Sequence, residues 1–253
     1  MPTPTNTLKA AIRAGRHLRG LWLALGSETV TDIAGRAGFD WCLVDGEHGP
    51  WDPTLIRRQL MVLASTGTPA VVRVPVNSDW VIKQALDIGA QTVMVPMVNS
   101  AAEARAAVAA CLYPPDGIRG NGGATIRAGG FGAIADYTAT ANAQICVIVQ
   151  AESRAAIADL AAIAAVDGVD CVFIGPADLA ADMGYRDDLS APALWDEIRK
   201  AIAVISAAGK MAGIIGPPAM TDEMVKAGVR FVGLGADSSI LTEALRHTIG
   251  GAP

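Results

Sequence analysis

Polar side chains stand where several short apolar stretches of the chain end. The apolar run Cys171–Ile174 is typical of a strand buried on both faces. It stops at Gly175-Pro176, a pair that ends a strand, and the carboxylate of Asp178 follows. Other apolar runs end in a similar way. The polar residues in such places are Asp45, Glu47, His48, Arg73, Gln150, Glu152 and Asp178.

Two of these residues, Glu152 and Asp178, are carboxylates that could hold a metal ion together. With no cysteine and a single histidine nearby, they suit a hard divalent cation, Mg²⁺ or Mn²⁺, and would also accept Co²⁺. Zn²⁺ would ask for more histidine or cysteine. Gln150 stands two residues before Glu152 on an extended chain, so we expect the two side chains to point the same way.

The other polar residues could supply proton transfer and charge. His48 is a candidate general base because histidine titrates near neutral pH, and Arg73 could stabilise a developing oxyanion. The N–H groups of Ala177 and Asp178 could hold a substrate carboxylate at a helix start. Structural interpretations exist for each: Asp45-Gly46 as a turn, Arg73 as half of an ion pair, and the acidic residues as favourable helix-start groups.

Apolar stretches alternate with segments of helical composition, which predicts a single (β/α)8 TIM barrel over residues 1–253. In such a barrel the C-terminal strand ends share one mouth, where the polar residues would converge. The predicted strands are Leu21–Leu25, Trp41–Asp45, Ala70–Val74, Thr92–Pro96, Ile145–Gln150, Cys171–Ile174, Met211–Ile215 and Phe231–Leu234. The predicted helices are Thr29–Ala37, Pro53–Ser65, Asp79–Ile88, Ala101–Cys111, Ser153–Ala164, Pro192–Ala208, Ala219–Ala227 and Asp237–Ile249.

The lysine positions argue against one kind of barrel chemistry. A barrel aldolase that forms an imine needs a lysine at the mouth. Four lysines fall in the N-terminal segment or in predicted helices, and Lys210 precedes the seventh predicted strand, at its wrong end. Schiff-base chemistry is therefore disfavoured.

Composition excludes several classes of partner and location. The chain is 51% hydrophobic and 18% charged with a net charge of −5, so neither nucleic acid nor an anionic membrane surface is indicated. No window is long and apolar enough to cross a membrane, and the N-terminal segment lacks the apolar core of a signal peptide. Four scattered cysteines indicate buried thiols in a reducing compartment. These features predict a cytoplasmic protein, and the alanine-rich helices favour an oligomer.

Six motifs, taken in order, resemble one known family. They are LVDGEH (43–48), VVRVPVN (71–77), QALDIGAQ (84–91), YPPDGIRG (113–120), VQAES (149–153) and FIGPADL (173–179). Together they resemble the 4-hydroxy-2-oxoheptanedioate aldolases, metal-dependent class II pyruvate aldolases that are related to the 2-keto-3-deoxy sugar-acid aldolases. The resemblance runs from about Gly20 to the last predicted helix.

The resemblance implies how a 2-oxo acid would be held. Glu152 and Asp178 would be the metal ligands, with Gln150 beside them, and the donor's own oxygens would complete the coordination. Arg73 would hold the keto oxygen and the enolate. No organic cofactor is implied. The residues that would bind or border the donor are Trp22, Arg73, Gln150, Gly175, Pro176, Ala177, Asp178 and Ile215.

The resemblance also implies proton transfer and assembly. His48 would be the acid and base, paired with Asp45 or, where a subunit contact brings it near, with Asp87. Family members are typically hexamers, trimers of dimers in which the last helix is swapped between subunits. The chain departs from the family after Arg119-Gly120, where Asn121–Ala128 replaces a run that usually starts with valine. That loop would lie near the aldehyde, so the departure bears on aldehyde preference.

These features predict a lyase that reversibly cleaves a 4-hydroxy-2-oxo acid into an aldehyde and pyruvate or hydroxypyruvate. A related acyl-CoA lyase or thioesterase is one alternative; it would need a basic entrance, for which Arg119 and Arg127 are candidates. A barrel that only binds phosphate or a sugar acid is the other. It would use the glycine-rich turns Gly213–Pro218 and Gly233–Ser239, where glycine equally permits close packing.

Overall fold

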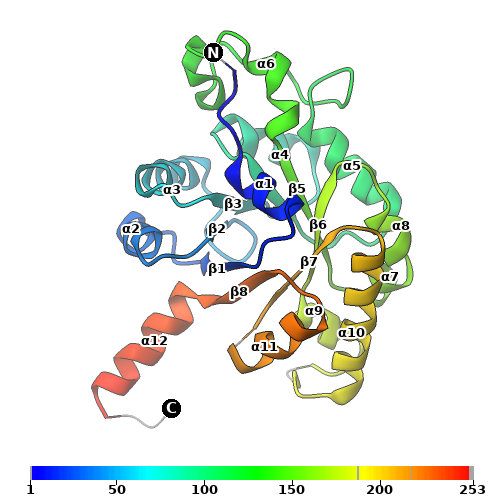
Figure 1. Cartoon of the computed structure of the whole chain (residues 1–253). Helices are drawn as coiled ribbons and strands as arrows, with labels where there is room; N and C mark the ends of the chain where they lie inside the picture. The colour runs from blue at the N-terminus through cyan, green and yellow to red at the C-terminus, as the bar shows by residue number, and fades with distance from the viewer. Residues whose placement is uncertain (1, 187, 217, 251–253) are drawn as a thin grey trace.

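Eight parallel strands close into a barrel in the computed structural model of this chain, which describes residues 2–186, 188–216 and 218–250. Each strand pairs with the next along the chain, and β8 returns to pair with β1. Helices surround the strands (Figure 1), so the predicted (β/α)8 barrel is confirmed. The expected domain of residues 1–253 includes positions 1, 187, 217 and 251–253, which lie outside the described residues.

The strands are β1 (Leu18–Leu23), β2 (Trp41–Asp45), β3 (Ala70–Arg73), β4 (Thr92–Val95), β5 (Cys146–Ala151), β6 (Val169–Ile174), β7 (Met211–Ile215) and β8 (Phe231–Ala236). The helices that follow them are α2 (Glu28–Arg36), α3 (Pro53–Thr66), α4 (Asp79–Asp87), α5 (Ala101–Cys111), α7 (Arg154–Ala158), α8 (Leu160–Ala164), α9 (Pro176–Asp182), α10 (Pro192–Ala207), α11 (Pro218–Ala227) and α12 (Asp237–Thr248). The remaining described helices are α1 (Thr7–Arg13), η1 (Arg127–Gly132), α6 (Tyr137–Thr140) and η2 (Asn142–Gln144).

Several helical features differ from the sequence-based expectation, including α1, α9 and the division of α7 from α8. α1 is not predicted by the apolar pattern; its N-terminus is capped by the side chain of Asn6, and its apolar residues close one end of the barrel. The single helix expected over Ser153–Ala164 is divided into α7 and α8 at Asp159. The Asp159 carboxylate accepts a hydrogen bond from the N–H of Ala101, the first residue of α5, at 2.7 Å. Asp159 therefore connects the α7–α8 segment to the neighbouring helix α5.

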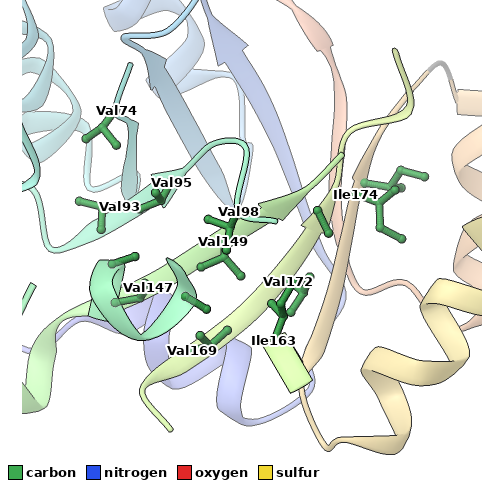
Figure 2. Close-up of a cluster of buried hydrophobic side chains, with 14 of the residues drawn as sticks. Val74, Val93, Val95, Val98, Val147, Val149, Ile163, Val169, Val172 and Ile174 are labelled. Atoms are coloured by element: carbon green, nitrogen blue, oxygen red, sulfur yellow. The ribbon is translucent and has the colours of Figure 1, made fainter. Parts of the chain in front are cut away.

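Aromatic side chains from β1, β2, β6 and β8 pack together in the barrel interior. Trp41 and Phe231 stack with ring centroids 4.1 Å apart, and Trp22 lies 5.5 Å from Trp41 and 5.4 Å from Phe173. A second apolar layer, which contains side chains of both strands and helices, forms on the outside of the strands. Figure 2 shows valines of β4, β5 and β6 within this layer. The strands are thus buried on both faces, as in other parallel barrels.

The C-terminal end of the chain is fastened to the mouth at one point. Asp237, the first residue of α12, accepts the N–H groups of Ala24 at 2.9 Å and Leu25 at 3.2 Å, just after β1 ends. Beyond this contact α12 projects away from the barrel (Figure 1), and apolar residues on it are exposed. The barrel is therefore closed without help from most of this helix.

Gly20 makes room for the aromatic interior and provides a test of this packing. A Cβ atom at this position would overlap the indole ring of Trp41, which is itself stacked on Phe231. We expect Gly20→Ala to lower the free energy of unfolding by about 1–3 kcal/mol, the usual cost of an overpacked core. Urea unfolding followed by circular dichroism measures this change.

Gly120→Ala is the matched control. Its Cβ would meet only the end of the Lys83 side chain, at 3.5 Å, an ordinary contact. The control should change the free energy of unfolding by no more than about 0.5 kcal/mol. Equal effects of the two substitutions would show that the Trp41 ring does not depend on the small residue beside it.

Candidate active site

Arg73 is held at the barrel mouth by two carboxylates. Its Nε donates to Oδ1 of Asp45 at 2.8 Å and one terminal nitrogen donates to Oδ2 at 2.6 Å, while the other lies 2.7 Å from a carboxylate oxygen of Glu47. The register of β2 and β3 places Asp45 directly beside Arg73. The side chains of Arg73 and Asp45 are buried, 8% and 2% exposed. A guanidinium paired in this way stays charged and has one orientation.

The turn after β2 folds around the same carboxylate. Oδ1 of Asp45 accepts the backbone N–H groups of Glu47 at 3.0 Å and His48 at 3.3 Å. The contact between Asp45 and His48 thus runs through the backbone, and Arg73 takes both carboxylate oxygens. His48 itself is exposed at the mouth. Its positive charge is one of the influences that lower the pKa of the neighbouring Glu47. The structure therefore brings His48 to the site and joins it to Asp45 through the main chain.

Glu152 is a buried carboxylate at the end of β5. Only 2% of the residue is exposed. Its Oε2 accepts a hydrogen bond from Nε2 of Gln150 at 3.0 Å, and its Oε1 accepts one from the backbone N–H of Met97 at 2.8 Å. The expectation that Gln150 and Glu152 point the same way is confirmed. Burial is the main cause that raises the pKa of Glu152 to about 7, and the negative charges of Glu47 and Asp178 raise it further. The hydrogen bond from the Met97 N–H acts in the opposite direction and lowers this pKa.

Asp178 and its loop complete the carboxylate group. Asp178 lies in the first turn of α9, is exposed, and is one of the charges that raise the pKa of both Glu47 and Glu152. Burial is the largest cause of the raised Glu47 pKa, and the Arg73 charge opposes it. Gly175, directly before α9, lies so close to Glu152 that a Cβ atom would overlap its carboxylate. The loop after β6 therefore reaches the carboxylate that ends β5.

The oxygen atoms of this site fit a hard divalent cation. Glu152 and Asp178 supply carboxylate oxygens, and Oε1 of Gln150 is buried without a hydrogen-bond partner, as a buried acceptor facing a bound group would be. Among residues 2–186, 188–216 and 218–250, no group of three or more His, Cys, Asp or Glu side chains is arranged to hold a metal. Mg²⁺ and Mn²⁺ suit such a site, because they keep positions for water and substrate.

Apolar residues form the floor beneath Arg73. The guanidinium lies 5.9 Å from the centre of the Trp22 ring, which is buried. Ile215, at the end of β7, packs against the same cluster. A Cβ atom at Gly233 would press on both Trp22 and Ile215, and one at Gly213 would press on Phe173. These contacts support the packing interpretation of the two glycines over a phosphate site.

Within this single chain, Asp87 does not lie at the mouth. Asp87 ends α4 and accepts a guanidinium N–H of Arg119 at 2.8 Å, close to where β4 begins and at the opposite end of the barrel from Arg73. Arg127 lies at the same end, where it donates to the carbonyl of Ile88 at 3.0 Å. The loop Asn121–Ala128, expected near the aldehyde, is thus placed elsewhere within the protomer, because the helix it follows runs away from the mouth.

Two residues of the site carry roles that sequence patterns did not assign. Glu47 was visible in the Asp-Gly-Glu-His motif, yet its ion pair with Arg73 becomes evident only from the structure. Met97 contributes through its backbone N–H, so its side-chain type offers no signal. The sequence could have indicated Glu47 by its position among strand-end polar residues.

The chain is similar over nearly its whole length to known proteins. The chain is 51% identical, over 97% of its length and 93% of the other protein's, to a hydroxypyruvate/pyruvate aldolase of Agrobacterium fabrum. It is 46% identical, over 97% and 95%, to a 4-hydroxy-2-oxo-heptane-1,7-dioate aldolase of Salmonella arizonae. A crystal structure of a family protein from Burkholderia cenocepacia superposes with a TM-score of 0.94 at 40% identity, covering 97% of this chain and 98% of the other.

The family model described as HpcH/HpaI aldolase/citrate lyase matches residues 18–244, which include every strand of the barrel and the first part of α12. The match therefore covers the carboxylate group, the Arg73 ion pairs and the floor beneath them. The chain belongs to the HpcH/HpaI aldolase/citrate lyase family.

Proposed function

We propose that this chain is a metal-dependent class II aldolase that cleaves 4-hydroxy-2-oxo acids into an aldehyde and pyruvate or hydroxypyruvate. The single observation that carries the proposal is the buried Glu152 carboxylate, with its pKa near 7, beside Asp178 and a rigidly held Arg73. Aldolases are carbon–carbon lyases, and the named relatives are aldolases. We infer pyruvate and hydroxypyruvate as donors from the name of a relative that is 51% identical to the chain, a hydroxypyruvate/pyruvate aldolase.

Glu152 and Asp178 would hold the divalent cation, Mg²⁺ or Mn²⁺, with Gln150 beside them; Co²⁺ would also suit these ligands. The chemistry that a bound cation supplies is polarisation of the donor's 2-oxo group. No organic cofactor enters the proposal. The buried Oε1 of Gln150 supports this arrangement, because an acceptor without a partner favours a positively charged or hydrogen-bond-donating occupant.

Arg73 would hold the keto oxygen of the donor as negative charge develops on it. Asp45 and Glu47 fix the guanidinium before substrate arrives, so little reorganisation is needed during the reaction. The N–H groups of Ala177 and Asp178, after the Gly175-Pro176 stop, would receive the donor carboxylate. Trp22 and Ile215 would border the donor and limit the entry of water.

His48 would move the hydroxyl proton. In the cleavage direction it takes the proton from the hydroxyl group on C4 as the C3–C4 bond breaks, so C4 leaves as an aldehyde carbonyl. The electron pair of the broken bond stays on C3 as the enolate held by Arg73, and a proton then adds to C3 to give pyruvate. In this structure His48 is exposed at the mouth, where such a substrate group would lie. A partner's Asp87 remains a proposed second pairing for His48.

The same family membership supports an assembly and a location for the enzyme. We expect a hexamer, a trimer of dimers, in which α12 packs on a neighbouring copy, because this helix projects from its own barrel with apolar residues exposed. All four cysteines are buried free thiols, which suits the reducing cytoplasm. In the described part of the chain, no helix is long and apolar enough to cross a membrane.

The alternative functions are disfavoured by specific contacts. Arg119 and Arg127, the basic entrance that an acyl-CoA substrate would need, are engaged by Asp87 and by the Ile88 carbonyl at the end of the barrel away from the mouth. A phosphate site after β8 would have to accommodate the buried carboxylate of Asp237, which like-charge repulsion opposes. The aldolase proposal needs neither.

The proposal is tested by offering the purified enzyme hydroxypyruvate or pyruvate together with a panel of aldehydes, and identifying the products by NMR. We expect 4-hydroxy-2-oxo acids to form with Mg²⁺ or Mn²⁺ present, because the enolate needs the cation's charge. EDTA should abolish the reaction, and excess Mg²⁺ or Mn²⁺ should restore it. Full activity in the chelator, or a borohydride-trapped adduct on a lysine, would contradict the proposal.

Metal binding should depend on pH through Glu152. A cation must displace the proton from this carboxylate, so with a pKa of about 7 the affinity is expected to fall about tenfold for each pH unit below 7. Above that pKa the affinity should level off. The dissociation constant of Mn²⁺, measured by electron paramagnetic resonance between about pH 5.5 and 8.5, checks this. A constant affinity over that range would be inconsistent with Glu152 as a ligand of raised pKa.

A further inference from the structure

Met97 has a backbone conformation that non-glycine residues rarely adopt. Its φ is 51°, in the left-handed region, and Phe131 is the other non-glycine residue with positive φ in the described part of the chain. Met97 lies on the loop between β4 and α5, two residues after the strand ends. Its side chain is 47% exposed, so packing of the side chain does not account for the conformation. A strained residue next to a functional group suggests a role for its backbone.

Contacts of the two residues that follow Met97 hold it in this conformation. The side chain of Asn99 donates to the Met97 carbonyl at 3.0 Å and accepts a hydrogen bond from the hydroxyl of Ser153. The N–H of Asn99 donates to the Glu103 carboxylate at 2.6 Å. Val98, between them, donates its N–H to the carbonyl of Gln150 at 3.0 Å and buries its side chain in the layer that includes Val149 (Figure 2). The loop after β4 is thereby attached to β5 and to the loop after it.

The result of this bracing is a hydrogen bond to one particular oxygen of Glu152. The Met97 N–H reaches Oε1 at 2.8 Å, while Nε2 of Gln150 reaches Oε2 at 3.0 Å. The backbone of Gly175 lies close to the same carboxylate, because a Cβ atom added there would overlap Oε2. The carboxylate plane is therefore set by three different segments, and the Met97 N–H is the backbone donor among them.

We propose that Met97 is a positioning residue for the divalent cation, acting through Glu152. Its left-handed backbone aims one N–H at Oε1 and so sets the orientation in which Glu152 receives the cation. This inference rests on the proposed metal-dependent function. Groups that hydrogen-bond a metal-binding carboxylate act on affinity, because a carboxylate free to rotate must be ordered when the metal binds.

The test compares three variants by their dissociation constants for Mn²⁺, read from the free-ion signal in electron paramagnetic resonance. Valine, a β-branched residue, disfavours a positive φ, so Met97→Val should weaken Mn²⁺ binding by about tenfold. Glycine adopts this φ freely and keeps the N–H, so Met97→Gly should bind at least about fivefold more tightly than Met97→Val. Asn99→Ala, which removes the brace on the Met97 carbonyl, should weaken binding in the same direction as Met97→Val.

Met61→Val is the matched control, since Met61 is a 54% exposed methionine on α3. It should leave Mn²⁺ affinity within about twofold of the unaltered enzyme. A purely structural role for Met97 would lower the unfolding temperature of the metal-free protein and leave the Mn²⁺ dissociation constant unchanged, and this outcome would overturn the inference alone. Failure of the unaltered enzyme to bind Mn²⁺ would overturn both the inference and the proposed function.

Discussion

The concentration of negative charge at the barrel mouth is the constraint on which the rest of the site depends. The carboxylates of Asp45, Glu47, Glu152 and Asp178 share this region with the guanidinium of Arg73. Removing like charges from water is costly, and it becomes tolerable only with cations or protons nearby. Arg73 offsets part of the negative charge of Asp45 and Glu47. The Glu152–Asp178 side then requires either a proton, which the raised pKa of Glu152 reflects, or a divalent cation.

The scaffold explains how this charge can be maintained. The polar residues of the site stand at the C-terminal ends of strands, on the loops directly after them or, for Asp178, in the first turn of the next helix. The strands are packed on both faces by apolar side chains. The aromatic interior, with Trp22 beneath Arg73, keeps water away from one side of the charges. Backbone N–H groups also hydrogen-bond the carboxylates. Those of the turn after β2 donate to Asp45, and one from the loop after β4 donates to Glu152. A rigid barrel can thus support an arrangement of charges that a flexible chain would avoid.

Much of this could be predicted from the sequence. Strand and helix periodicities give the barrel, and the barrel brings Arg73, Gln150, Glu152 and Asp178 to one mouth. The same alternation explains why Asp87 lies far from His48 within one chain: it ends α4, which runs away from the mouth, so its pairing with His48 across a subunit contact stays a prediction.

Three other features became evident only from the structure. The ion pair of Glu47 with Arg73 depends on how the turn after β2 folds, which no periodicity describes. The left-handed conformation of Met97 carries no sequence signal, because glycine or asparagine usually marks such a position. α1 was missed because a short helix is stabilised by its Asn6 cap and by tertiary burial rather than by its own pattern.

We propose that Arg73 and the cation-binding pair Glu152 and Asp178 stabilise an enolate. The most direct test of this proposal is the exchange of the C3 protons of pyruvate with deuterium in D₂O, followed by proton NMR with Mg²⁺ and without any aldehyde. We expect the unaltered enzyme to exchange these protons. The exchange rate should be about 100-fold or more lower in Arg73→Ala, because this variant lacks the group that stabilises the oxyanion. Arg199→Ala, at an exposed arginine on α10, should exchange normally. Exchange that is absent from the unaltered enzyme, or that survives intact in Arg73→Ala, would contradict the account.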